Sequence, residues 1–310
     1  MYFKHNVTLA PYTTFKIGGR AKLFIEVNDP IELAEALETA AREKTPVYVL
    51  GGGSNTLFSD NGFDGLVIRM TDGGILIKPE GKIVAGSGMP LRDILESAAE
   101  NGFSGMETLA GIPGSFGGAL RGNAGAFGND IGRHIVSVKT FDQKTGMVKE
   151  VLAKDCEFGY RKSFFKEHPQ TIILSAVIAL TPNGVSTDMR RIMKETIAKR
   201  EEKHSQTALC AGSFFMNPVV KDRELQKEFE LEAKTECRDD KLPAGWLIDH
   251  VGLRGKTIGG AMVSNEHPNY IVNTGNAKAE DVVMLSSLIK TRVRDELGVM
   301  LQEEVNMVGF

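Results

Sequence analysis

The apolar residues of this chain recur with two different periods, which predict strands and helices. Residues 21–27 alternate between apolar and polar side chains and residues 47–50 form a continuous apolar run, so both predict β-strands. Between them, residues 29–44 carry apolar positions at helical spacing. Asp29 is a typical N-cap, and Glu32 at the third helical position would complete a capping box. The segment therefore predicts a β-α-β unit.

The same two periods continue along the rest of the chain. A helix expected over residues 279–298 places five apolar side chains on one face and ends at Gly298. Those five side chains are Val282, Leu285, Ile289, Val293 and Leu297. Strands are predicted at residues 66–70, 75–78, 82–86, 135–142 and 171–180, and helices at 90–101 and about 186–206.

Three consecutive glycines follow the strand at residues 47–50. Gly51, Gly52 and Gly53 carry no side chains, permit positive φ and let the backbone approach a neighbouring group closely. Backbone N–H groups in such a loop can bind an anion such as a pyrophosphate. The loop matches neither a P-loop nor the dinucleotide-binding fingerprint. From these residues alone, a plain tight turn and a phosphate-binding loop are both open.

A second glycine-rich stretch spans residues 111–128 and holds seven glycines in eighteen positions. That glycine content argues against a stable helix or the interior of a sheet. A disordered linker is one interpretation. The interleaved Ile112, Phe116, Leu120 and Phe127 favour an ordered loop that wraps a ligand, because linkers rarely carry so many large apolar side chains.

Composition narrows the class of protein. The chain has 310 residues, of which 42% are hydrophobic and 25% charged, as in a soluble globular protein with two or three domains. A net charge of −3 without a basic cluster argues against a nucleic-acid partner, and no apolar stretch approaches the length of a membrane span. The three cysteines lie far apart and the six histidines form no metal-binding motif. With no apolar core of a signal peptide near its start, the sequence predicts a cytoplasmic, metal-free protein.

Several ordered blocks of sequence are more specific than any single motif. They are TTFKIGG (13–19), VLGGGSN (49–55), AGIPGSFGGALRGNAGAFG (110–128), FGYRKSFF (158–165), AGSFFMNP (211–218), AGWLIDHVGLRGKTIGGAMVS (244–264), NYIVNTGNA (269–277) and EEVNMVGF (303–310). Together the chain resembles the UDP-N-acetylenolpyruvoylglucosamine reductase family, flavoenzymes of peptidoglycan precursor synthesis and hence of cell-wall biogenesis, cell shape and cell division. The resemblance implies reduction of the enolpyruvyl ether of UDP-N-acetylglucosamine enolpyruvate to UDP-N-acetylmuramate, with FAD as cofactor and NADPH as reductant.

The same resemblance implies an α+β fold in several parts. An FAD-binding unit of the p-cresol methylhydroxylase type, built from two α+β subdomains, would be joined to a smaller α/β substrate-binding domain. The expected bounds are residues 1–70 and 71–204 for the two FAD-binding subdomains and 205–300 for the substrate-binding domain. The tail, residues 301–310, would return to the active site.

Both glycine-rich loops are assigned to the cofactor by this resemblance. The first loop would hold the FAD pyrophosphate, and the second would wrap the rest of the cofactor. The residues assigned to FAD are Gly51, Gly52, Gly53, Ser54, Asn55, Ile112, Pro113, Gly114, Ser115, Gly118, Asn123, Ala124 and Gly125.

Three residues match the catalytic positions of the family. The reaction develops negative charge beside a carboxylate, so it needs a fixed cation and a proton donor. Arg161 is always charged and can bind a carboxylate through two hydrogen bonds. Ser213 would give its proton to the enolate, which is basic enough to take it. Glu304 would assist the enolate and its proton relay, with the adjacent Glu303 as an alternative for that role.

Neighbouring positions carry further expectations. Tyr160 and Asn217 resemble substrate-contacting positions, with a packed aromatic as the alternative for Tyr160. Some relatives carry Cys at the Ser213 position, and Cys210 is expected to be a bystander. Met216 stands where many relatives have Lys, so one cation near the substrate is in doubt.

The interval between Arg161 and Ser213 is short, at 52 positions (213 − 161). Members of a longer class insert a substrate-covering loop in this interval, and the short interval resembles the type II class, which lacks it. Two alternatives to the reductase are an oxidase on the same flavin fold and a non-catalytic flavin-binding module. We expect a monomer that binds small molecules, with no nucleic-acid or membrane partner.

Overall fold

The computed structural model describes residues 2–202 and 207–310, and the chain divides into two compact units. Unit 1 consists of residues 1–7, 21–53 and 64–206, and unit 2 of residues 8–20, 54–63 and 207–310. The boundary that the sequence predicts between residues 204 and 205 falls outside the described residues. One passage of the chain between the units comes directly after Gly53, inside the first glycine-rich loop.

The two units group three segments differently from the sequence-based division. The sequence predicts residues 8–20 and 54–63 in the first FAD-binding subdomain, but they belong to unit 2. The tail, residues 301–310, also belongs to unit 2, where β16 (Asn306–Val308) pairs in parallel with β4 (Thr56–Phe58). The separation of unit 1 into two FAD-binding subdomains stays a prediction.

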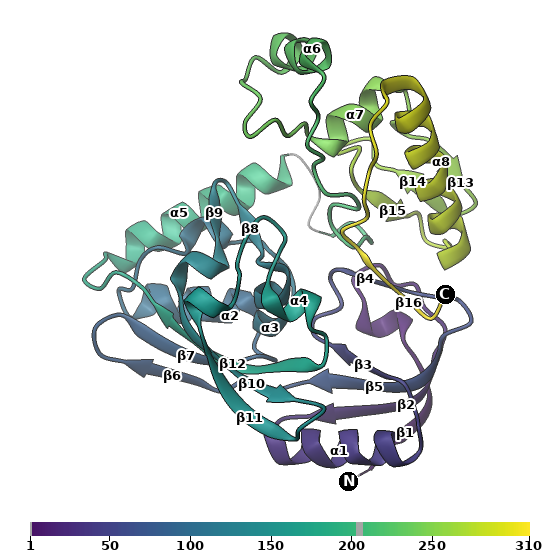
Figure 1. Ribbon diagram of the computed structural model, residues 1–310. Coiled ribbons are helices and arrows are strands. Elements are labelled where there is room, and N and C mark those ends of the chain that lie inside the picture. The colour runs from purple at the N-terminus through teal and green to yellow at the C-terminus, as the bar shows by residue number, and fades with distance from the viewer. Residues whose placement is uncertain (1, 203–206) are drawn as a thin grey trace. The chain divides into compact units, whose positions relative to one another are not determined.

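Unit 1 contains two β-sheets (Figure 1). Their strands are β1 (Lys4–Thr8), β2 (Arg20–Val27), β5 (Phe63–Met70) and β3 (Val47–Leu50) in the first sheet, and β11 (Met147–Leu152), β10 (Ile135–Asp142), β12 (Thr171–Ala179), β7 (Lys82–Gly86) and β6 (Ile75–Lys78) in the second. Neighbours in these lists are hydrogen-bonded; β3 and β5 run in parallel, and the second sheet is antiparallel throughout. Every strand that the apolar pattern predicts is present, and its ends agree within three residues.

Helices pack on both sheets of unit 1. They are α1 (Pro30–Arg42), α2 (Leu91–Glu100), α3 (Phe116–Gly122), α4 (Phe164–Glu167) and α5 (Ser186–Glu201). α1 shares a core with the first sheet, and α2, α3 and α5 share one with the second. Asp29 caps α1 as predicted, because its carboxylate accepts hydrogen bonds from the backbone N–H groups of Ile31 and Glu32. The capping box differs from the prediction, since Glu32 accepts from the backbone N–H of Asn28.

The second glycine-rich stretch contains a helix, which corrects the expectation that its glycine content excludes one. α3 begins after Ser115, whose side chain caps it, and ends at Asn123 in the left-handed conformation. Phe116 and Leu120 are fully buried in the core of unit 1. A good cap and the burial of these two side chains outweigh the low helix propensity of glycine. The stretch then continues into a short hairpin of β8 (Gly125–Ala126) and β9 (Asn129–Asp130).

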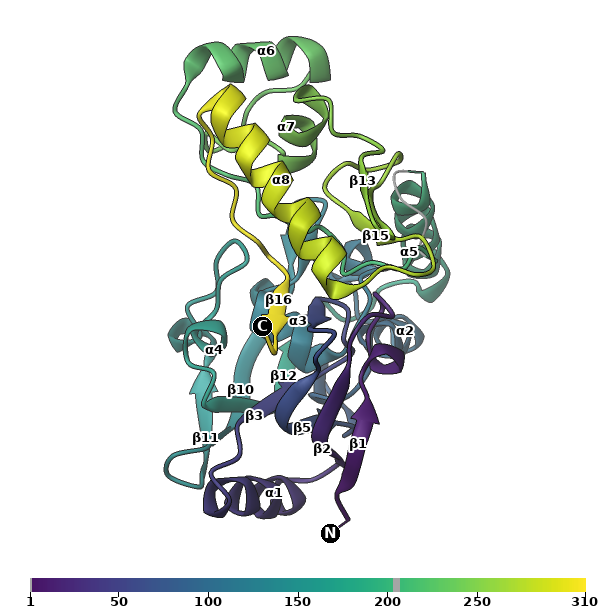
Figure 2. The same cartoon turned by 90° about the vertical axis from the view of Figure 1, so that its right-hand side faces the viewer.

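Unit 2 combines helices and short strands around one hydrophobic core. Besides β4 and β16 it contains α6 (Arg223–Ala233), α7 (Ala244–His250), β13 (Thr257–Ile258), β14 (Ala261–Val263), β15 (Ile271–Asn273) and α8 (Ala279–Leu297). α8 follows the prediction: Val282, Leu285, Ile289 and Val293 are buried, Leu297 is partly buried against the same core, and Gly298 ends the helix with a φ of 67°. After α8 the tail runs back beside that helix (Figure 2).

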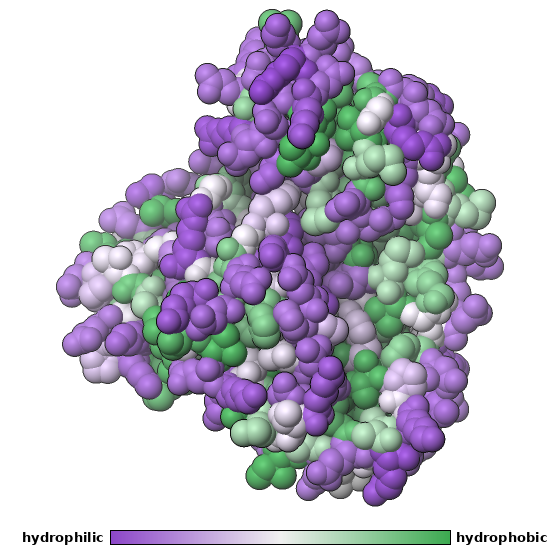
Figure 3. All heavy atoms as spheres, in the orientation of Figure 1, coloured by the Kyte–Doolittle hydropathy of each residue, from purple (hydrophilic) through white to green (hydrophobic). Residues whose placement is uncertain are grey.

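The helices of unit 2 are amphipathic rather than apolar all round. α6 buries Leu225 and Phe229 and exposes charged side chains, and Figure 3 shows a hydrophilic surface over this helix. Among the residues that the structure describes, no helix combines the length and the apolar character needed to cross a membrane.

Hydrogen bonds join the three chain segments of unit 2. Thr14 Oγ1 donates to the carbonyl oxygen of Cys210 at 2.6 Å, and Asn273 Nδ2 donates to that of Phe15 at 3.1 Å. The backbone N–H of Glu280, at the start of α8, donates to a carboxylate oxygen of Asp60 at 3.1 Å. The segments at 8–20 and 54–63 are therefore structural parts of unit 2 and not loops lying on its surface.

Candidate active site

The two glycine-rich loops lie against each other in unit 1. A Cβ atom at Gly52 would lie 2.6 Å from the Cα atom of Gly114 and 2.9 Å from the amide nitrogen of Ser115. A Cβ atom at Gly51 would lie 2.4 Å from Ser115 Oγ. Gly52 has no room for a side chain against this backbone, and a side chain at Gly51 would displace the Ser115 hydroxyl that caps α3. Two loops assigned to one cofactor from sequence are therefore neighbours in the structure.

A buried serine adjoins these loops and was not identified from the sequence. Ser87 follows β7, is 3% exposed, and accepts a hydrogen bond from the backbone N–H of Gly117 through its carbonyl oxygen. Its hydroxyl oxygen is buried and has no hydrogen-bond partner among the described residues. Buried polar groups normally have a partner, so an unpartnered hydroxyl here is consistent with a ligand beside α3.

Other residues assigned to the cofactor have structural roles in the second loop. Ser115 caps α3 and accepts a hydrogen bond from the backbone N–H of Gly118 at 3.4 Å. The side chains of Ile112 and Ala124 pack against the core of unit 1. A Cβ atom at Gly125 would lie 2.5 Å from the carbonyl oxygen of Asn129, so the β8–β9 hairpin requires glycine there.

Arg161 lies at the tip of a tight turn in unit 1. Gly159 and Lys162 exchange two backbone hydrogen bonds of 3.1 Å, and Arg161 has a left-handed φ of 53°. Both terminal nitrogens of its guanidinium lie 3.4 Å from the carbonyl oxygen of Gly125. Tyr160 is 47% exposed, and its ring centre lies 5.5 Å from the guanidinium carbon. The structure therefore brings Arg161 and Tyr160 to the loop that begins the β8–β9 hairpin.

Asn123 connects that turn to the end of α3. Its side-chain nitrogen donates to the carbonyl oxygen of Gly159 at 2.8 Å, and its side-chain oxygen accepts from the backbone N–H of Gly132 at 2.9 Å. The residue is 3% exposed. The sequence assigns Asn123 to the cofactor, whereas both ends of its amide are bonded to the protein backbone.

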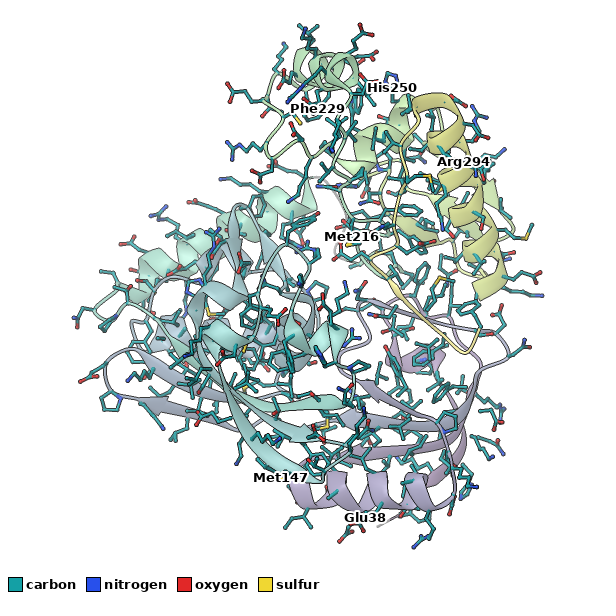
Figure 4. The ribbon with its side chains drawn as sticks, in the orientation of Figure 1. Glu38, Met147, Met216, Phe229, His250 and Arg294 are labelled. Carbon is teal, nitrogen blue, oxygen red and sulfur yellow. The ribbon has the colours of Figure 1, made fainter. Side chains whose placement is uncertain are left out.

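Ser213 and Glu304 lie on neighbouring segments of unit 2. The backbone N–H of Glu304 donates to the carbonyl oxygen of Phe214 at 2.8 Å, and that of Met216 donates to Gln302 at 2.9 Å. Phe215 and Glu303 form an antiparallel bridge between these two bonds. The pairing sets Phe214 opposite Glu304, so Ser213, one position before Phe214, lies on the segment next to Glu304 although the two residues are far apart in the sequence. Figure 4 labels Met216 in this extended segment.

Asn269 binds the segment that follows Ser213 on the edge opposite the tail, and it was not identified from the sequence. Its backbone carbonyl accepts from the N–H of Phe214 at 2.7 Å. Its side chain accepts from the N–H of Phe215 at 3.0 Å and donates to the carbonyl oxygen of Phe215 at 2.8 Å. An amide that bonds both polar groups of one residue reproduces the pairing of a strand, and nothing in the local sequence indicates this role.

The structure distinguishes the two adjacent acids of the tail. Glu303 forms an ion pair of 2.8 Å with Lys290 of α8. The carbonyl oxygen of Glu304 accepts from Asn55 Nδ2 at 3.1 Å, and Asn306 donates to the carbonyl oxygen of Asn55 through both its backbone and side-chain nitrogens at 3.0 Å. Glu303 thus has a structural partner, and Glu304 is fixed to the segment that follows the first glycine-rich loop. Ser54 and Asn55 belong to unit 2, unlike the three glycines before them.

Asn217 and Cys210 have surroundings that bear on their assignments. The side-chain oxygen of Asn217 accepts from the backbone N–H of Ala244 at 3.0 Å, at the first residue of α7. The Cys210 thiol is buried, and burial raises its pKa above the ordinary value, while a hydrogen bond from the Gly212 backbone opposes the rise. The raised pKa keeps this thiol protonated, and the assignment of Cys210 as a bystander stays a prediction.

One group of side chains in unit 2 has the composition of a metal site. Glu228, Glu232 and His250 place one ligand atom each within 4.8 Å of one another, and all three residues are exposed. Trp246 accounts for part of this arrangement, because it donates to Glu232 at 2.7 Å and its ring lies 4.7 Å from that of His250. Figure 4 labels Phe229 on α6 and His250 on α7, which flank this ring. Exposed acidic groups of this kind are common without a metal.

Comparisons with known proteins cover nearly the whole chain. Residues 21–151 match the FAD binding domain family, and residues 203–308 match the C-terminal domain family of UDP-N-acetylenolpyruvoylglucosamine reductase. UDP-N-acetylenolpyruvoylglucosamine reductase of Solibacter usitatus is 37% identical, over 97% of this chain and 95% of the relative. Reductase 1 of Bacillus cereus is 36% identical over 98% and 94%. The crystal structure of the Thermus caldophilus enzyme has a TM-score of 0.78 at 31% identity and covers 99% of this chain and 100% of that one.

The fold and the FAD-binding match define the class of this protein, an FAD-dependent oxidoreductase. At 37% identity over nearly its full length, the chain belongs to the UDP-N-acetylenolpyruvoylglucosamine reductase family. The family and the fold class predicted from the sequence, an α+β protein with an FAD-binding unit of the p-cresol methylhydroxylase type, are confirmed.

Proposed function

We propose that this chain reduces the enolpyruvyl ether of UDP-N-acetylglucosamine enolpyruvate to UDP-N-acetylmuramate, with NADPH as the reductant. The observation that carries the proposal is the pairing in unit 2 of Phe214, the residue after Ser213, with Glu304. A proton donor and an acid on neighbouring segments suit a reaction that ends with protonation of a carbon atom. The place of action is then the cytoplasm, in cell-wall precursor synthesis.

The residues present fit FAD. The cradle consists of two glycine-rich loops in such close contact that Gly52 cannot carry a side chain, and the hydroxyl of Ser87, which has no partner among the described residues, lies next to α3. Gly51 to Asn55 would hold the pyrophosphate and the loop from Ile112 to Gly118 the rest of the cofactor. When bound, FAD supplies hydride transfer from NADPH to the substrate.

The protein side chains then manage charge and protons. The guanidinium of Arg161 binds the substrate carboxylate and stabilises the negative charge that develops beside it. The hydroxyl of Ser213 gives its proton to the carbon atom next to that carboxylate. Glu304 assists the enolate and its proton relay, and Tyr160 and Asn217 line the substrate. The interval of 52 positions between Arg161 and Ser213 (213 − 161) suits the type II class, which lacks the substrate-covering loop.

Anaerobic spectroscopy of the purified protein tests this proposal against its alternatives. The flavin absorbance should fall when NADPH is added under nitrogen and return when UDP-N-acetylglucosamine enolpyruvate follows, with one product formed per NADPH consumed. Return of the absorbance only on admission of air would favour an oxidase. Absence of any change with NADPH would favour a non-catalytic flavin-binding module.

A further inference from the structure

The turn that carries Arg161 has a backbone conformation that arginine rarely adopts. Arg161 is the third residue of a four-residue turn closed by reciprocal hydrogen bonds between Gly159 and Lys162, and its φ is 53°. A positive φ at this position is the mark of a type II turn, which normally places glycine or asparagine there. Such strain persists only where the surrounding structure enforces it, and it is concentrated at functional sites.

Three side chains enforce the conformation of this turn. Asn123 donates to the carbonyl oxygen of Gly159 at 2.8 Å, at the start of the turn. The Lys166 ammonium donates to the carbonyl oxygen of Arg161 itself at 3.1 Å. Just after the turn, the buried hydroxyl of Ser163 donates to the carbonyl oxygen of Arg121 at 2.7 Å. The start of the turn is thus bonded to Asn123, which directly follows α3, and the residue after the turn is bonded to Arg121 of α3.

The surroundings of Asn123 fix the orientation of its side chain. It is 3% exposed and adopts the left-handed conformation that ends α3, with a φ of 42°. Its side-chain oxygen is held by the backbone N–H of Gly132. A Cβ atom at Gly132 would lie 2.8 Å from that oxygen and 2.6 Å from the Phe158 ring, so only glycine permits this packing. The amide therefore has a single orientation, with its N–H group directed at Gly159.

We propose that Asn123 is a positioning residue for Arg161: its amide fixes the strained turn that presents the guanidinium to the substrate carboxylate. This role differs from the contact to FAD that the sequence assigns to the same residue. It rests on the proposed function, because it needs Arg161 to bind the carboxylate. A guanidinium misplaced by a relaxed turn would bind the carboxylate less well, while the flavin loops would be unaffected.

Asn123→Asp tests the proposal with the smallest change. Aspartate keeps the oxygen that accepts from Gly132 but places a second oxygen against the carbonyl of Gly159, so the turn loses its donor. FAD content and the rate of flavin reduction by NADPH should match the parent. Reoxidation by UDP-N-acetylglucosamine enolpyruvate should slow by roughly tenfold or more, the size of a lost buried hydrogen bond. The dissociation constant of UDP-N-acetylmuramate, followed by its effect on the flavin spectrum, should rise by a similar factor.

Two further variants make the result specific. Asn129→Asp is the matched control, because Asn129 also donates its amide to a backbone carbonyl, that of Gly105 at 2.9 Å, and its other side-chain bonds go to Thr108 and His134, outside the Arg161 turn. Both half-reactions of that variant should stay within about twofold of the parent. In an Arg161→Met background, Asn123→Asp should add almost nothing, since residues that act through one group are not additive.

Several outcomes would overturn the proposal. Loss of FAD from Asn123→Asp, or equal slowing of both half-reactions, would make Asn123 a cofactor ligand. An additive double variant would separate Asn123 from Arg161. If Asn123→Asp does not fold, Lys166→Met is the second test, because Lys166 is partly exposed and donates to the carbonyl oxygen of Arg161. An unchanged reoxidation rate in Lys166→Met would contradict the positioning role. Failure of the proposed function is distinguishable, because the parent protein itself would then not be reoxidised by the substrate.

Discussion

The turn around Arg161 in unit 1 and the paired segments around Ser213 and Glu304 in unit 2 hold their functional residues in different ways. At the turn, side chains such as Asn123 and Lys166 bond to backbone carbonyl groups and hold one residue in the left-handed region. In unit 2, backbone N–H and carbonyl groups bond to one another across an antiparallel bridge.

This difference determines how each place responds to mutation. The backbone hydrogen bonds between residues 214–216 and 302–304, here called the ladder, do not depend on side chains. Ser213 and Glu304 should therefore tolerate most changes in their neighbours. A strained turn held by side chains relaxes when one of them is removed. The turn should therefore be sensitive to residues that never touch the substrate. The paired segments should be less sensitive, except at residues such as Asn269, whose side chain bonds both polar groups of Phe215.

The largest effect is expected for Ser213→Ala, which tests the ladder. The variant should keep its fold and its FAD, because the pairing of residues 214–216 with 302–304 uses backbone groups. Flavin reduction by NADPH should be nearly unchanged, and reoxidation by the enolpyruvyl substrate should slow by about 10²–10⁴-fold, the usual contribution of general acid catalysis. Stopped-flow absorbance under nitrogen follows both steps. Equal slowing of the two would show that Ser213 positions ligands and does not give a proton.

Arg161→Met is the corresponding change at the turn. Methionine keeps most of the side-chain length and removes the charge and every donor, so turnover should fall by roughly 10²–10³-fold, as for the loss of one preorganised donor. The melting temperature should not fall by more than a few degrees, because the guanidinium bonds to Gly125 are long, at 3.4 Å.

Arg161→Gly sharpens this test. Glycine removes the strain of the left-handed φ, so this variant should be equally inactive but at least as stable as Arg161→Met. A glycine variant that is clearly less stable would mean that the turn stores no strain.

The sequence predicts elements whose stability is local. α8 is an example, because its buried face and its C-cap at Gly298 are both visible in the residues. α3 is the opposite case: its glycines argue against a helix, and it exists because Phe116 and Leu120 are buried by distant parts of unit 1. Burial by residues remote in sequence cannot be inferred from one short pattern.

The residues of the site show the same difference between local and long-range features. Resemblance to a family identifies Arg161, Ser213 and Glu304, and the structure brings the last two to neighbouring segments. The residues that hold these segments in place could not be predicted, because each forms a hydrogen bond to a residue far away in the sequence. Asn55, for example, donates to the carbonyl oxygen of Glu304, 249 positions away. Asn123 was assigned to the cofactor for the same reason: its sequence block indicates a site, but not which atoms its amide binds.

A smaller effect is expected for Asn306→Ala, which removes one side-chain hydrogen bond beside the paired segments of unit 2. Alanine loses the side-chain bond to the carbonyl oxygen of Asn55 but keeps the backbone bond to the same oxygen and the pairing of β16 with β4. Turnover should fall by about fivefold, since one such hydrogen bond contributes about 1 kcal/mol. The turnover of Asn306→Ala and of Asn123→Asp should be measured in the same steady-state assay. A larger loss of turnover for Asn306→Ala would reverse the contrast between ladder and turn.

The smallest effect is expected at Cys210, close to Ser213. Burial raises the pKa of Cys210, and burial together with the charge of Asp155 raises the pKa of Cys156 to about 11. Both thiols should stay protonated at about pH 8, near the ordinary thiol pKa of about 8.5. Iodoacetamide should therefore leave both unmodified in the folded protein and alkylate them in denaturant, as peptide mass spectrometry would show.

The same raised pKa values give a pH dependence of stability with a definite sign. Above about pH 8.5 the unfolded chain loses its thiol protons while the folded chain retains them, so stability should fall as the pH rises toward about 11. Cys210→Ala should remove the contribution of its thiol and leave turnover within about twofold of the parent, because Cys210 is buried and is not one of the residues assigned to the substrate. Alkylation of Cys210 in the folded protein with a matching loss of turnover would make this thiol, and not Ser213, the proton donor to test next.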